Sequence, residues 1–235
     1  MTTVDIIKKG VIFRQKEFLL SLCVFAYLLV SFSILSLKLS EGYLLLLQVF
    51  FLLFENYVTV AVYYGIKEYI FEGKFNIPGM FMKAGYFFFR VLSYKLFAGF
   101  FALLLAAFCM SMIELVKSSS LAAAGFVTGF TILWIAFPVY LLLLTFFAPL
   151  IIITEDSLVF SSVRASVAFM RGNLAEAVKL VLVTAPFWAF ALFLTRVYNG
   201  KGLYLLTGTV FYLIAVLEII TIRIFLLFYK ARRKE

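Results

Sequence analysis

The sequence predicts an all-α, polytopic integral membrane protein with six transmembrane helices. Of its 235 residues, 65% are hydrophobic and only 14% are charged. A soluble domain is about half apolar and about a quarter charged, so this chain has too few polar side chains to cover a water-soluble globule. The apolar residues also form long continuous runs, close to the about 20 residues that a helix needs to cross about 30 Å of hydrocarbon.

Each of six apolar runs is expected to form a helix, because a helix satisfies its own backbone hydrogen bonds in lipid. Together they predict one transmembrane domain over residues 1–235. The expected helices are 18–37, 43–66, 96–115, 121–153, 174–194 and 203–229. Prolines interrupt helices, and we expect interruptions at Pro138 and Pro149 in the fourth helix and at Pro186 in the fifth.

The basic residues predict the orientation. Of the 21 Lys and Arg residues, sixteen fall on the side of the N-terminus, four fall on the other side, and Arg223 lies within the last run. Because cytoplasmic loops carry the excess of Lys and Arg, we expect a multi-pass protein of the cytoplasmic (inner) membrane with both termini cytoplasmic. The basic tail "YKARRKE" is then an anchor on anionic lipid, and no nucleic-acid partner is expected.

Two cytoplasmic connectors, between the second and third and between the fourth and fifth helices, are expected to form amphipathic helices. In the second connector, Arg164 and Arg171 lie at the edge of an apolar helical face. The opposite side, which includes Ser166, is small and lets another helix approach closely. Gly172 is expected to end this helix, and Asn173 to cap the next one. The apolar face consists of Val159, Phe160, Val163, Val167 and Met170.

Two interpretations of the second connector stay open. It is either a simple linker that rests on lipid headgroups, or a docking surface for a cytoplasmic partner or a headgroup through Arg164 and Arg171. The two connectors also match when the chain is shifted by 88 residues, so that "FMKAG" at 81–85 falls on "FMRGN" at 169–173. This match indicates a candidate internal duplication.

Several polar residues lie inside the expected membrane helices, where they are costly and usually face the interior of the bundle. Glu55, Asn56 and Glu218 are the main candidates for an intramembrane site. The two carboxylates could share a proton or a cation, or bind a basic group; alternatively, neighbouring polar groups of the bundle satisfy each one.

Three basic residues fall just inside the cytoplasmic edge of the membrane. Lys95, Lys179 and Arg223 could form a basic ring for phosphate headgroups. Alternatively, each could extend separately to the interface.

The residue types argue against an enzyme. The chain has no histidine, its only aspartates are Asp5 and Asp156, and it has no glycine-rich phosphate loop. Zinc hydrolase motifs need histidines, and nucleotide-binding loops need closely spaced glycines. We therefore expect no catalytic residues, no cofactor and no metal site.

The segment around the second connector resembles a known family. Pro149, the apolar strip "LIII", Glu155 and "SSVRASVAFMRGNL" are similar to the six-helix membrane domain attached to some bacterial glycerophosphodiester phosphodiesterases, and to its stand-alone relatives of unknown function. Ser166, Arg171, Gly172 and Asn173 match the corner of that family, whereas Leu174 replaces the usual aromatic residue. The resemblance implies a helical membrane scaffold with lipid- or envelope-related duties.

The sequence therefore suggests two functions. The first is a non-catalytic membrane subunit or scaffold that holds lipid or a partner protein through its cytoplasmic-side helices. The alternative is a transporter component, either a compact permease or an exporter half that works with a separate ATPase. The expected partners are membrane lipids and a membrane or cytoplasmic protein such as that ATPase, and a homodimer is also compatible with the sequence.

Overall fold

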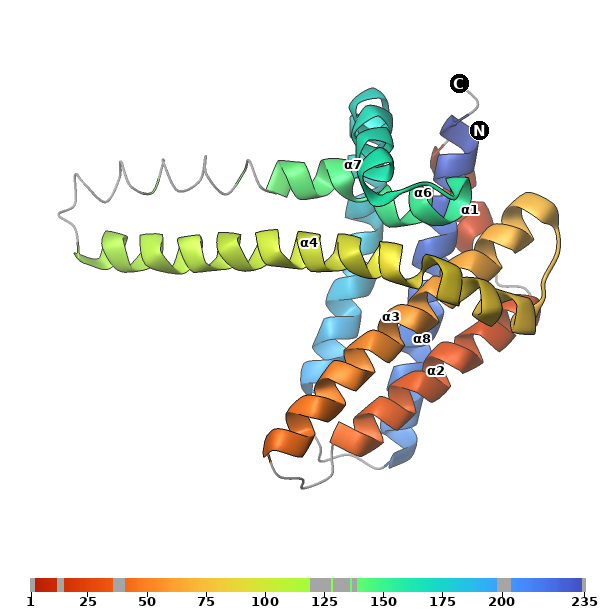
Figure 1. Ribbon diagram of the computed structural model, residues 1–235, viewed down its shortest axis with the longest axis horizontal. Helices are drawn as coiled ribbons and strands as arrows, with labels where there is room; N and C mark the ends of the chain where they lie inside the picture. Colours follow the sequence, from red (N-terminus) through yellow and green to blue (C-terminus); the bar gives the residue numbers. More distant parts are fainter. Residues whose placement is uncertain are drawn as a thin grey trace. The chain divides into compact units, whose positions relative to one another are not determined.

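A computed structural model describes residues 3–11, 15–35, 41–118, 128, 136, 139–197 and 204–233. Its elements within these residues are helices, which confirms the all-α class (Figure 1). They are α1 (Thr3–Val11), α2 (Gln15–Leu35), α3 (Glu41–Glu72), α4 (Ile77–Ser118), α6 (Ala148–Glu155), α7 (Val159–Val197) and α8 (Tyr204–Arg232).

Three of these helices are long and apolar enough to cross a membrane. The candidate spans are Leu45–Glu72 in α3, Ile77–Met112 in α4 and Thr209–Arg232 in α8. Shorter apolar helices cover Phe18–Val30 and Val139–Glu155. Most of the expected fourth helix before residue 139, including Pro138, lies outside the described residues. The topology of six crossings therefore stays a prediction.

The chain divides into two compact units, and each is considered separately. Unit 1 comprises Met1–Phe88 and Asn173–Glu235, and unit 2 comprises Phe89–Gly172. The boundaries fall within α4 and α7. Unit 1 thus contains the ends of the chain, whereas unit 2 contains the second connector.

In unit 1, helices α2, α3 and α8 pack against one another (Figure 1). Helix α3 is antiparallel to α2, since Tyr27 contacts Phe51 and Phe54 early in α3 whereas the earlier Leu20 lies beside Gly65. The buried side chains of these helices are mostly aliphatic and aromatic, with a few polar ones such as Ser21 and Asn56, and their packing stabilises the helix contacts.

The end of α3 receives a polar partner from α8. Gly73 follows α3 with a φ of +70°, and its N–H donates to the carbonyl of Tyr69 at 3.2 Å. The Lys230 ammonium donates to the carbonyl of Ile70 and lies 4.9 Å from the centre of the Phe71 ring. A basic group at a helix C-terminus satisfies the last carbonyls and the helix dipole. Lys230, in the tail expected to bind lipid, therefore also joins α8 to α3.

Helix α1 is an element that the sequence reasoning did not predict. It packs along α8 with Ile6 fully buried and Gly10 facing Ile224, while Lys8 and Lys9 are exposed. A Cβ atom at Gly10 would overlap the Ile224 side chain. Glycine is therefore required for this close approach of α1 to α8.

Replacing Gly10 with alanine should loosen α1 from α8, because overpacking a tight contact costs about 1–3 kcal/mol. Faster hydrogen exchange in α1 of the detergent-solubilised protein would report the loss. Combining Gly10→Ala with Ile224→Ala should restore protection, since the second change removes the overlapping atoms. Gly42→Ala is the matched control, because a Cβ there meets no atom within 4 Å. Unchanged exchange in Gly10→Ala would contradict the contact.

Candidate functional site

The second connector begins at a break in the helix before it. Residues 139–145 are helical, the chain turns at Phe146–Phe147, and α6 starts at Ala148 with Pro149 in its first turn. The interruption expected at Pro149 is therefore present. Proline has no N–H, so Pro149 cannot donate to the carbonyl of Thr145 four residues earlier.

Side chains from elsewhere in unit 2 supply donors at this break. The Tyr94 hydroxyl of α4 donates to the carbonyl of Thr145 at 2.7 Å. The Ser166 hydroxyl of α7 donates to the carbonyl of Leu144 at 2.8 Å, and Ser166 is fully buried. An unpaired buried carbonyl costs about 1–3 kcal/mol. These two bonds therefore position α4 and the first part of α7 around the break.

A second contact of α4 holds the corner between α6 and α7. Asp156 ends α6 in the left-handed conformation, with φ 52° and ψ 41°. The Arg90 guanidinium contacts the Asp156 carboxylate at 2.7 Å and the carbonyl of Ser157 at 3.5 Å. Arg90 lies one turn before Tyr94, so one side of α4 contacts both the break and the corner.

These contacts determine which side of the connector helix, residues 159–172, is buried. Ser162, Ser166 and Met170 are buried, and the Phe169 ring lies 5.1 Å from that of Phe147. Phe160, expected on the same face as Met170, is instead 85% exposed. The small serine side packs inward, as the close approach of another helix requires.

The opposite side of the connector helix forms what we call the outer face. Phe160 is 85% exposed, and Arg164 and Arg171 are also exposed. Leu158, which directly precedes the first helical residue, is 69% exposed. At 100° per residue, Phe160, Arg164 and Arg171 lie within about 40° of one another around the helix. The outer face therefore combines apolar and basic side chains in one stripe.

The connector helix ends one residue later than expected. Gly172 is helical, and the backbone leaves helical geometry at Asn173, with φ −128° and ψ 19°. Glu176, three residues beyond it, pairs with Lys179 at 2.9 Å. The change of direction at the Gly172–Asn173 pair is thus present. The interruption expected at Pro186 is wrong, because Pro186 lies within the continuing helix, and the non-helical backbone angles of α7 are at Asn173.

The first connector has a different structure. Helix α4 begins at Ile77 and continues without interruption through Gly85, the residue that the shift of 88 aligns with Asn173. The expected amphipathic helix and the membrane helix after it are therefore one helix. The corner is a feature of the second connector.

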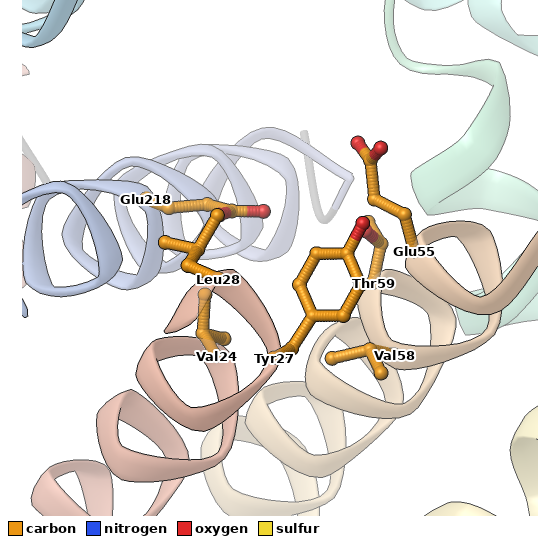
Figure 2. Close-up of a pocket in the computed structure, with 7 residues that line it drawn as sticks. All are labelled: Val24, Tyr27, Leu28, Glu55, Val58, Thr59 and Glu218. Carbon is orange, nitrogen blue, oxygen red and sulfur yellow. The ribbon is translucent and has the colours of Figure 1, made fainter. Parts of the chain in front are cut away.

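Unit 1 contains a cavity of about 150 Å³ between α2, α3 and α8 (Figure 2). Glu55 and Glu218, predicted to lie at similar depth, both line it. Figure 2 shows the Glu218 side chain pointing toward Tyr27 and Thr59, whereas the Glu55 carboxylate points away from Val24 and Val58. The cavity is lined by Val24, Tyr27, Leu28, Glu55, Val58, Thr59 and Glu218.

Such a cavity combines acidic and hydroxyl oxygens with an aliphatic wall. Its volume is sufficient for several water molecules or a small cation. Oxygen atoms of carboxylates and hydroxyls can accept hydrogen bonds from an ammonium group or share a proton. Among the described residues, no three His, Cys, Asp or Glu side chains are grouped to hold a metal ion.

Asn56 lies apart from this cavity. It is 2% exposed, and its amide nitrogen donates to the carbonyl of Phe88 at 3.4 Å. Within the described residues its side-chain oxygen has no hydrogen-bond partner. Glu55 and Glu218 thus line the same cavity, whereas the neighbouring Asn56 is bonded to Phe88 of α4.

The proposed basic ring has members in different environments. Lys95 in unit 2 is half-buried, Lys179 in unit 1 is exposed and paired with Glu176, and Arg223 in unit 1 is 7% exposed. Arg223 is therefore buried within the bundle. The binding of a phosphate headgroup by these three residues together stays a prediction.

Sequence reasoning missed Arg90 and Tyr94. Their spacing of four residues places them on one side of a helix, and the proline at 149 indicates that a nearby carbonyl needs another donor. These signals say that a donor is required, but not which residue supplies it. Comparisons with protein families, with curated proteins and with solved structures found no match for this chain.

Replacing Tyr94 with phenylalanine should destabilise the protein by about 1–3 kcal/mol, because the Thr145 carbonyl loses its donor. The free energy of unfolding in mixed micelles measures this loss. Pro149→Ala restores a backbone N–H that can reach Thr145, so the cost of Tyr94→Phe should be smaller in the Pro149→Ala background. Equal costs in both backgrounds would show that the Tyr94 bond does not replace the missing proline donor.

Proposed function

We propose that this chain is a non-catalytic membrane subunit or scaffold that holds lipid or a partner protein through its cytoplasmic-side helices. The observation that supports it most is the outer face of the connector helix. Three side chains, Phe160, Arg164 and Arg171, are exposed on one side of a helix whose other side is bonded through Ser166 and whose corner is held by Arg90. A rigid, exposed surface of this kind suits binding.

The proposed topology has six crossings in the inner membrane with both termini cytoplasmic. The three span-length helices are compatible with a membrane protein, and the distribution of Lys and Arg supports the orientation. In this topology the connector helix is on the cytoplasmic side. The resemblance to the membrane domain of bacterial glycerophosphodiester phosphodiesterases supports a scaffold role near lipid.

Charge reversal of the outer face tests the scaffold function. In affinity purification with mild detergent, the wild type should retain lipid or a partner protein, and Arg164→Glu with Arg171→Glu should lose it without loss of yield. Both arginines are exposed, so folding should tolerate the changes. Lys74→Glu with Lys83→Glu, at two exposed positions of unit 1, is the control for net charge.

The outcome of this purification decides the proposal. A wild-type protein recovered alone, with neither lipid nor protein, would contradict the scaffold function. If the wild type and the arginine variant retained the same amount of lipid or partner protein, the binding surface would lie elsewhere than on the outer face.

A second candidate function is a transporter component, and the cavity of unit 1 favours it. Two carboxylates from different helices line one cavity together with two hydroxyls. Ionisable groups inside a membrane are costly and commonly mark ion or proton pathways. Glu55 and Glu218 would carry a proton or a cation, alone or with a separate ATPase as energy source.

Flux through reconstituted vesicles tests the transport function. With a pH-sensitive dye inside, vesicles containing the wild type should conduct protons faster than protein-free vesicles, and Glu55→Gln or Glu218→Gln should abolish the difference by removing the titrating groups. Glu72→Gln is the control, since Glu72 ends α3 and pairs with Lys67 at 3.5 Å, outside the cavity. Wild-type flux equal to that of protein-free vesicles would argue against proton transport by this chain without a separate ATPase.

A further inference from the structure

The outer face has a fixed direction within unit 2. Ser162 and Ser166 are fully buried, and Ser166 is bonded to the Leu144 carbonyl. Rotating the connector helix to bury Phe160 would expose these serines and leave that carbonyl unpaired. The cost of an unpaired buried carbonyl therefore keeps Phe160, Arg164 and Arg171 on the outside.

Apolar segments of the chain also lie directly before and directly after the connector helix. Helix α6 ends at Glu155 and α7 begins at Val159, and the three residues between them can extend no more than about 10 Å. Residues Leu150, Ile151, Ile152 and Ile153 of α6 are buried and apolar. After Gly172 the sequence continues directly into the apolar run 174–194. In the proposed topology, the helix therefore cannot leave the surface of the membrane.

The chemistry of the outer face suits the boundary between headgroups and acyl chains. Exposed Phe160 can enter the acyl region, as apolar residues of interfacial helices do. Arginine binds phosphate through two parallel N–H groups, is less strongly hydrated than lysine, and can extend a charged end from an apolar stem. Arg164 and Arg171, seven residues apart, lie two turns apart on the same side of the helix.

We propose that the outer face binds the phosphate groups of anionic phospholipids in the leaflet beside it. Arg164 and Arg171 contact the phosphates, and Phe160 inserts among the acyl chains. The inference rests on the proposed scaffold function and names its ligand. Lipid is favoured over a protein partner because the face lies where the chain meets the membrane and because its charge complements an anionic leaflet.

The first measurement is lipid binding to the full chain in detergent. Native mass spectrometry follows a titration with phosphatidylglycerol and, in parallel, with zwitterionic phosphatidylcholine. Each basic residue at the surface contributes about fivefold to the binding of anionic lipid. Arg164→Gln with Arg171→Gln should therefore weaken phosphatidylglycerol binding about 25-fold and leave phosphatidylcholine binding unchanged. Lys74→Gln with Lys83→Gln, which removes the same charge from unit 1, should have little effect.

The second measurement locates the outer face in the bilayer. A nitroxide label at Phe160→Cys, in a background with Cys23→Ser and Cys109→Ser, is placed in vesicles containing phosphatidylglycerol. Collisions with oxygen should exceed collisions with a water-soluble nickel complex. A second label at Arg164→Cys, at the level of the headgroups, should show a smaller ratio of oxygen to nickel collisions.

Two results would overturn the inference. Equal phosphatidylglycerol affinity in the wild type and the arginine variant would show that these arginines do not bind the lipid. A label at position 160 that collides mainly with the nickel complex would place the face in water. If a protein partner still co-purified through Arg164 and Arg171, the scaffold function would stand and only its lipid ligand would be wrong.

Discussion

The structure of unit 2 depends on satisfying the backbone carbonyls where a helix breaks in an apolar environment. Lipid offers no hydrogen-bond donor, so irregular backbone must find its partners within the protein. Pro149 removes one donor, and Tyr94 and Ser166 supply bonds to Thr145 and Leu144. Since Tyr94 belongs to α4 and Ser166 to α7, these bonds determine how both helices approach the break. The direction of the outer face follows from them.

The same constraint operates at the end of α3 in unit 1. There the carbonyl of Ile70 is bound by the Lys230 ammonium, and Gly73 takes the positive φ that turns the chain. A basic tail beside a membrane usually serves as a lipid anchor. Here one of its members is bound to a helix end, so its charge also stabilises the fold. Basic residues cannot all be counted as available for lipid.

The two units present different chemistry to possible ligands. In unit 1, Glu55 and Glu218 line a small cavity, whereas unit 2 exposes Arg164 and Arg171 beside Phe160. Both arrangements suit holding a charged group: a cation or proton in the first case and a phosphate in the second. The buried polar side chains on which the units depend, such as Ser166, form hydrogen bonds to the backbone. Ser166 also fixes the position of its helix, because the carbonyl that it binds belongs to Leu144, before the break.

The sequence alone determined the features that depend on neighbouring residues. Long apolar runs require helices in any apolar surrounding, Pro149 favours a break before it, and the Gly172–Asn173 pair favours a change of direction. Proline alone does not decide a break, because Pro186 lies within α7. The sequence also identified Glu55 and Glu218 as carboxylates within apolar helices. The spacing of residues could not decide whether Ser166 or Phe160 faces inward, because that choice depends on a carbonyl 22 residues away. Likewise, three contacts join distant parts of the chain: α1 packs on α8, Lys230 binds the end of α3, and Arg90 pairs with Asp156. Only the tertiary structure decides such contacts, since each depends on which donors and surfaces are left unsatisfied after the helices have formed.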